Sequence, residues 1–163
     1  MKMKTNRQEG FSLIELLIVV AIIGIIAAIA IPNLLASKRA ANEGSAIASL
    51  RTLTGAEATY QSTKGAGEYG SLTDMQTEGL VDSVLGAGTK SGYAYTVATL
   101  PSSTTAPARF NASCVPQAAT GIGATGTRSF YTNESGVIYF LAGGTAPTAD
   151  ATTRAVATGA PLK

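Results

Sequence analysis

The hydrophobic pattern divides the first 64 residues of the chain into two parts. Residues 11–31 form an almost uninterrupted apolar run in which Glu15 is the only charged side chain. Residues 32–64 are more polar, with charges such as Glu43 and Glu57 interspersed, and their apolar side chains recur at three- and four-residue spacing. This spacing predicts a helix with one buried face. The face comprises Ala46, Ile47, Leu50, Leu53, Ala56 and Tyr60.

Both parts are expected to belong to one helix, continuous or gently kinked, from Phe11 to about Lys64. Gly65 is expected to end this helix as a left-handed cap. Gly24 and Pro32 are the expected kink positions, because glycine is entropically costly in a helix and proline removes a backbone donor.

Glycines punctuate residues 65–92, which we interpret as a connector that contains one short helix. Ser71 or Thr73 can cap the start of that helix, and Gly79 can end it. Residues 80–85 fit either a further helical turn or a short strand.

Period-two alternation predicts three or four strands after the connector. Their expected order is an antiparallel meander, whose apolar face covers the second half of the long helix. The candidate strands are residues 93–98, 109–115, 128–132 and 137–141, and residues 133–136 form the turn of the last hairpin.

The predicted fold class is therefore α+β, with a long N-terminal helix packed on a small antiparallel sheet. Residues 65–141 form the globular head. Residues 142–163 consist largely of Ala, Thr, Gly and Pro. We expect a loose or only locally pinned tail there, because such a segment cannot bury enough apolar surface to order itself.

Composition narrows the chemistry. The 163 residues, 45% of them hydrophobic, suffice for one compact domain and a membrane segment. The absence of histidine removes the commonest general base and metal ligand. No catalytic residue, cofactor or metal site is predicted. Cys114, the single cysteine, is expected to be a small buried side chain.

The apolar run is long enough to cross a membrane, because a helix over residues 11–31 reaches roughly 31 Å. Lys2, Lys4 and Arg7 precede it and are expected to stay in the cytoplasm. An ordinary signal peptide has a shorter apolar core and no reason to carry Glu15. A carboxylate at the centre of a spanning helix costs about 2.5–3.5 kcal/mol and less near the interface, so Glu15 is a functional candidate.

The order of residues at the start of this run resembles the prepilin signature of type IV pilins and type II secretion pseudopilins. The shared features are a basic leader, Gly10 before the cleavage point, Phe11 after it, Glu15 four residues later, and Gly24 and Pro32 further on. The resemblance covers about the first third of the chain.

This resemblance implies that residues 1–10 are a leader peptide, which a prepilin peptidase removes by cutting between Gly10 and Phe11 and then methylating the Phe11 amine. It also implies that Glu15 guides docking into a filament, its carboxylate approaching the Phe11 amine of a neighbouring subunit. A charge buried among apolar helices is unfavourable alone and tolerable when paired, which is consistent with that role.

The partners that the resemblance implies are further copies of the chain, the peptidase, the membrane, and an inner-membrane assembly platform with its ATPase. The precursor would cross the inner membrane once. The mature subunit would then reside in an extracellular pilus or a periplasmic pseudopilus.

The chain departs from many type IV pilins, which close a C-terminal loop with two cysteines. Either the loop is held otherwise here, or the protein is closer to the pseudopilins. Some pseudopilins bind calcium in a head loop, but Asp74, Asp82, Glu134 and Asp150 do not form a recognisable ligand loop.

The leading hypothesis is thus a structural subunit of a type IV pilus. The alternatives are a pseudopilin of a type II secretion system, or a minor pilin with a role in adhesion or DNA uptake. A membrane-anchored enzyme is disfavoured because no nucleophile–base motif is present. No specific nucleic-acid partner is predicted, because the basic residues of the head are scattered: Lys64, Lys90, Arg109 and Arg128.

Overall fold

One long helix runs through the N-terminal part of the protein. The computed structural model describes residues 10–162. These divide into two compact units, one ending at Ala36 and the other beginning at Ser37. The helix, α1 (Leu13–Thr63), contributes to both units. The predicted long helix is therefore confirmed, with slightly tighter bounds.

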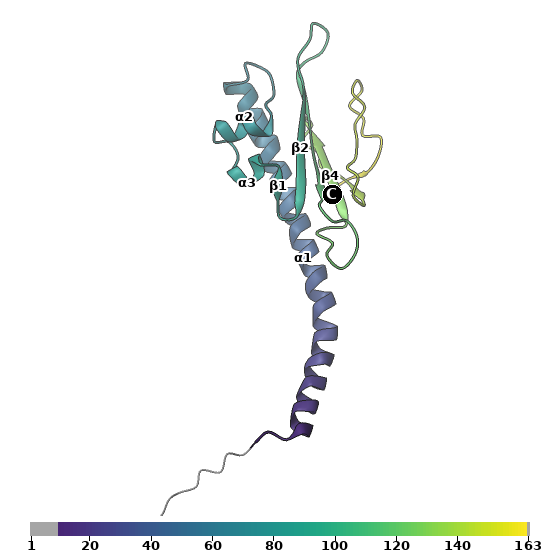
Figure 1. Ribbon diagram of the computed structural model, residues 1–163. Coiled ribbons are helices and arrows are strands. Elements are labelled where there is room, and N and C mark those ends of the chain that lie inside the picture. Colours follow the sequence, from purple (N-terminus) through teal and green to yellow (C-terminus); the bar gives the residue numbers. More distant parts are fainter. Residues whose placement is uncertain (1–9, 163) are drawn as a thin grey trace, which may run out of the picture. The chain divides into compact units, whose positions relative to one another are not determined.

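The second unit contains a six-stranded sheet in which each strand is hydrogen-bonded to the next along the chain, all antiparallel. Its strands are β1 (Thr89–Lys90), β2 (Tyr93–Leu100), β3 (Arg109–Pro116), β4 (Arg128–Asn133), β5 (Tyr139–Ala142) and β6 (Ala160–Pro161). The predicted α+β class and the meander are confirmed (Figure 1). The two-residue strands β1 and β6 at the edges were not predicted, because two residues show no periodicity.

Two short helices precede the sheet. The first, α2 (Leu72–Thr77), has Ser71 as its N-cap, and the Asp74 carboxylate accepts a hydrogen bond from the Ser71 backbone N–H in a capping box. Gly79 follows the end of α2 with a φ of 70°, as predicted. Of the undecided segment 80–85, residues 83–85 lie in a second short helix, α3 (Ser83–Gly86), which is capped by Asp82.

The core lies between the second half of α1 and the sheet. Leu50 and Leu53 of α1 are fully buried and belong to one apolar cluster with Tyr93, Phe110 and Phe130 of the sheet. The predicted burial of this helix face is confirmed. Cys114 is also in the cluster, and burial raises the pKa of its thiol to about 12. It is therefore the small buried side chain that was expected.

The expected role of Gly65 at the end of α1 was wrong. The residues with left-handed backbone are Ala66, with a φ of 50°, and Gly67, with a φ of 97°. Gly65 is instead required by a close approach, because a Cβ atom there would overlap the carbonyl oxygen of Glu68. The Gly65 N–H donates to the carbonyl oxygen of Tyr60, five residues earlier, which satisfies one of the last carbonyl groups of the helix.

The tail was expected to be loose or only locally pinned, and the structure shows local contacts with the sheet. β6 pairs with β5, and a further bridge joins Ala149 to Val156. Leu162 packs against the core. As the composition indicated, the segment buries little apolar surface of its own, and its contacts with the sheet are mainly hydrogen bonds and one ion pair.

Two acids lie on the buried face of α1, and sequence reasoning missed them. Glu43 and Glu57 continue the three- and four-residue spacing of Leu50 and Leu53, which was the available signal. Glu43 accepts two hydrogen bonds from Thr127 and forms an ion pair with Arg128. Burial alone would raise the pKa of Glu43, but these partners hold it below the ordinary value.

Glu57 has a different environment. It is fully buried, and one carboxylate oxygen accepts a hydrogen bond of 3.0 Å from the backbone N–H of Gly70. Its other oxygen has no partner among the described residues. Burial, with a smaller contribution from the negative charge of Asp74, raises the pKa of Glu57 from 4.5 to about 7. Above neutral pH the folded head therefore holds a buried charge that forms no ion pair with any residue of 10–162.

We predict that Glu57→Gln makes the head more stable at pH 8 and leaves it nearly unchanged at pH 4. Because the folded-state pKa is raised, the favourable neutral form is fully present below about pH 4.5, and stability is lost as the pH rises through about 7. The difference between these pKa values corresponds to roughly 3 kcal/mol. Urea unfolding of the full chain in mild detergent, followed by circular dichroism, measures the free energy of unfolding of wild type and variant at both pH values. An equal gap between variant and wild type at both pH values would contradict the assignment.

Candidate assembly site on the N-terminal helix

The first unit exposes its apolar side chains. Every large apolar side chain of residues 11–34 is between 50% and 92% exposed. An 18-residue window of α1 has a mean hydropathy of 3.1. By length and composition alone, the helix is long and apolar enough to cross a membrane. A surface of this size is not stable in water, so lipid or other apolar helices must cover it.

Glu15 lies in the first turn of this helix. Ser12 directly precedes α1, and its backbone N–H donates to Glu15 Oε2 at 2.9 Å. This is the same return contact that the third helical residue makes in a capping box. Among residues 10–162 the Glu15 carboxylate makes no ion pair. The contact orients the carboxylate at the helix start but leaves its negative charge uncompensated within an apolar surface.

The predicted cleavage position lies just before the helix. Gly10 and Phe11 precede α1 in non-helical backbone, and Phe11 is 92% exposed. An extended, exposed peptide is the form that a protease active site can bind. The proposed new terminus would thus lie within one helical turn of Glu15 along the chain.

The predicted kink positions both lie inside α1, which continues through them. A Cβ atom at Gly24 would meet nothing within 4 Å. After Pro32, the Asn33 side chain donates to the carbonyl oxygen of Ile29 at 3.1 Å. This bond adds a donor in the turn where proline lacks one. Bending at Gly24 and Pro32 stays a prediction.

Comparison with known proteins finds relatives for this part of the chain. The family model for the prokaryotic N-terminal methylation motif matches residues 5–31. The chain is 48% identical over 58 residues to the type IV major pilin protein PilA of Myxococcus xanthus, which is 36% of this chain and 26% of the relative. It is 66% identical over 35 residues to the type IV wide pilus major component PilA4 of Thermus thermophilus, which is 22% of this chain and 27% of the relative.

A second group of relatives belongs to secretion systems. The chain is 36% identical over 59 residues to the type II secretion system core protein G of Aeromonas hydrophila, which is 36% of this chain and 41% of the relative.

The N-terminal third is thus similar both to type IV pilins and to type II secretion pseudopilins, and it carries the N-terminal methylation motif. The matched part is 26–41% of the length of these three relatives. No solved structure matches the chain significantly.

In the head that follows this pilin-type segment, the acids considered for calcium binding lie apart and serve local structure. Asp74 completes the capping box of α2, whose N-cap is Ser71, and Asp82 caps α3. Glu134 is paired with Arg154, and Asp150 accepts the N–H groups of Thr152 and Thr153 in a tight turn. No group of three potential metal ligands occurs among residues 10–162.

The basic residues of the head are likewise engaged by the same chain. Among the described residues four of them pair with acids, and Arg109 donates to the carbonyl oxygen of Ala151 at 2.6 Å. Their charges are therefore largely compensated and do not form one basic groove for a polyanion. The four ion pairs are Lys64–Glu78, Lys90–Asp82, Arg128–Glu43 and Arg154–Glu134.

Proposed function

We propose that the chain is a structural subunit that polymerises into a type IV pilus filament through its N-terminal helix. The observation that carries this proposal is the position of Glu15 among exposed apolar side chains in the first part of α1, where residues 10–162 provide no ion-pair partner for it. Two relatives that share this segment are named as major pilus components, which supports the same assignment.

The proposed order of events begins in the membrane. A prepilin peptidase cuts between Gly10 and Phe11 and methylates the new amine of Phe11. The freed amine is positive, and it lies at the start of the helix that carries Glu15. When helices from several copies bundle, the amine of one copy can neutralise the Glu15 carboxylate of another. This pairing favours one register of subunit addition, because a shifted neighbour leaves both charges buried and unpaired.

A type II secretion pseudopilin is the second candidate. The chain has one cysteine, which is buried in β3, so it lacks the cysteine pair that closes the C-terminal loop of many type IV pilins. The similarity to core protein G of secretion systems also favours this candidate. Electron microscopy distinguishes the two, because long sheared surface fibres support a pilus and short periplasmic rods with lost secretion support a pseudopilus.

In either case the proposed role is structural rather than enzymatic. The precursor is proposed to span the inner membrane once and to be taken up by an assembly platform and its ATPase. A minor subunit with an adhesion or DNA-uptake role has less support, because the basic side chains of the head are used within the chain.

We predict that the mature protein begins at methylated Phe11. Intact mass measurement of the protein extracted from cells should therefore show loss of residues 1–10 and gain of one methyl group. Gly10→Val should block the cut, because a branched side chain hinders access to the peptide bond. Full-length protein in wild-type membranes would contradict the processing step.

We predict that Glu15→Ala and Glu15→Gln both lower the yield of sheared filaments by at least about tenfold, because breaking a buried ion pair costs about 3–5 kcal/mol. Glutamine retains a hydrogen-bond acceptor for the Ser12 N–H but has no charge. The glutamine variant therefore separates the pairing role from the helix-start contact. Glu78→Gln, which removes a charge from the head, is the control and should assemble normally.

Both Glu15 variants should be cleaved and inserted as the wild type is. Normal filament yield from Glu15→Gln would show that the local contact with Ser12 is all that matters, and would overturn the ion-pair proposal.

A further inference from the structure

The C-terminal segment 143–162, here called the strap, covers the outer edge of β5. β6 pairs with β5 through only two residue pairs, Tyr139 with Pro161 and Phe140 with Ala160. Within the strap Pro147 is the one buried residue. Apolar burial alone therefore does not explain why the strap is ordered.

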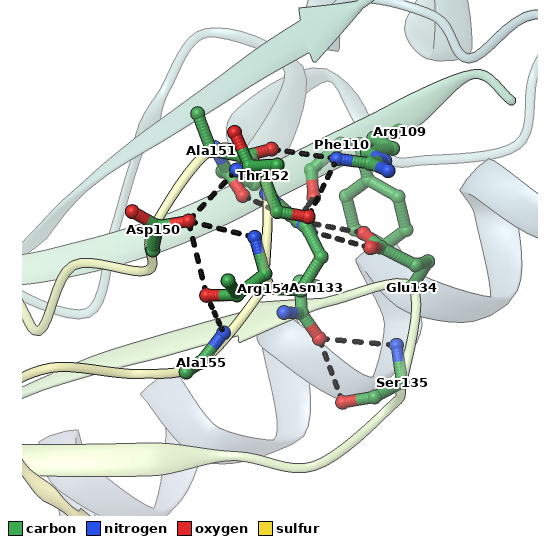
Figure 2. A network of polar contacts seen from close by, with 12 residues as sticks. Arg109, Phe110, Asn133, Glu134, Ser135, Asp150, Ala151, Thr152, Arg154 and Ala155 are labelled. Atoms are coloured by element: carbon green, nitrogen blue, oxygen red, sulfur yellow. Dashed lines mark hydrogen bonds and ion pairs between the residues drawn. The ribbon is translucent and has the colours of Figure 1, made fainter. Parts of the chain in front are cut away.

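One arginine side chain of the strap makes several contacts with the sheet and its turns. Arg154 donates from Nε and Nη2 to the two carboxylate oxygens of Glu134, at 2.6 and 2.7 Å, in a two-pronged pair. Its Nη2 also donates to the Phe110 carbonyl oxygen at 2.9 Å and to Asn111 Oδ1 at 2.7 Å. Figure 2 shows these contacts, which connect the strap with β3 and with the β4–β5 turn.

The contacts of the Arg154 side chain are made although its backbone adopts an unfavourable conformation. Its φ is 60°, in the left-handed region, which costs a non-glycine residue about 1–2 kcal/mol. Asp150 closes the turn that presents Arg154, by accepting the N–H groups of Thr152 and Thr153 at 2.9 and 2.7 Å. The turn therefore positions the Arg154 guanidinium group so that it contacts β3 and the β4–β5 turn.

A second arginine approaches the same turn from the sheet. Arg109 of β3 donates from Nη1 to the carbonyl oxygens of Ala151 and Thr152. Beside this contact a surface cleft of about 380 Å³ separates the turn from the β2–β3 loop. The strap turn therefore rests on polar contacts and not on close apolar packing.

We propose that Arg154 is a noncovalent clasp that holds the strap over the β5 edge, in the place of a covalent cross-link. Cys114 cannot serve this purpose, because it is fully buried and is the only cysteine in the chain. The closure of the strap is consequently independent of redox conditions. It depends on the fork of hydrogen bonds to Glu134, Asn111 and the Phe110 carbonyl group.

The proposal is tested by hydrogen exchange of the full chain in mild detergent. The reporters are strap amides that are hydrogen-bonded, such as Ala157 to Thr148 and Leu162 to Ile138. Arg154→Ala should raise exchange in the strap at least about tenfold and leave β2 and β3 within about twofold, because the strap opens as a separate unit. Arg51→Ala, which removes an exposed arginine from α1, is the matched control and should change neither.

Three further measurements make the test specific. Arg154→Lys keeps the charge but loses the fork, so strap exchange should stay high. Glu134→Gln should raise strap exchange, and adding it to Arg154→Ala should cause no further rise, because both remove the same contact. A reducing agent should have no effect on the wild type.

Unchanged strap protection in Arg154→Ala would overturn the proposal. An equal rise in strap, β2 and β3 would also overturn it, because Arg154 would then stabilise the head as a whole. Full protection in Arg154→Lys would show that charge alone suffices and would reject the fork.

Discussion

A carboxylate on an apolar helix requires a partner for its charge, and α1 meets this constraint in three ways. Glu43 has Arg128 and two hydrogen bonds from Thr127. Glu57 has the Gly70 N–H and a raised pKa, so that it is easily neutralised by a proton. Glu15 has only the Ser12 N–H among the described residues. The first two acids are accommodated by the head itself, whereas Glu15 needs a cation that residues 10–162 do not provide. The proposed assembly supplies one, in the form of a neighbouring chain's amine.

The head of this weakly charged, alanine-rich chain is held together by a shared apolar core and by specific polar contacts. Its sheet and α1 share one apolar cluster, and its edges are completed by two-residue strands. The strap adds little buried area, so its position rests on Arg154, Glu134 and the Asp150 turn. Because removal of residues 1–10 leaves equal numbers of acidic and basic side chains, attraction between whole mature subunits by net charge is small. Individual ion pairs, rather than the net charge of whole subunits, therefore have to determine the register in which subunits add to the filament.

The sequence was sufficient where the signal is local or periodic. The spacing of Leu50 and Leu53 predicted the buried helix face, and Ser71 with Gly79 predicted the bounds of α2. It was insufficient where a partner lies far along the chain. The burial of Glu43 depends on Arg128, and the order of the strap depends on Glu134. For Glu15 the sequence supplied the candidate and its proposed role, while the structure adds the Ser12 contact that any test must separate from that role.

The most direct test is carbodiimide coupling of assembled fibres made from a mixture of ¹⁴N- and ¹⁵N-labelled subunits. This reagent joins a carboxylate to an adjacent amine, and mass spectrometry of the digest identifies the pair. The account predicts a peptide that joins Glu15 of one copy to the N-terminal Phe11 of another, with mixed labels. The Lys64–Glu78 pair, whose Nζ and Oε2 atoms are 3.2 Å apart, serves as the internal positive control. Fibres that couple Lys64 to Glu78 but never Glu15 to Phe11 would contradict the central claim.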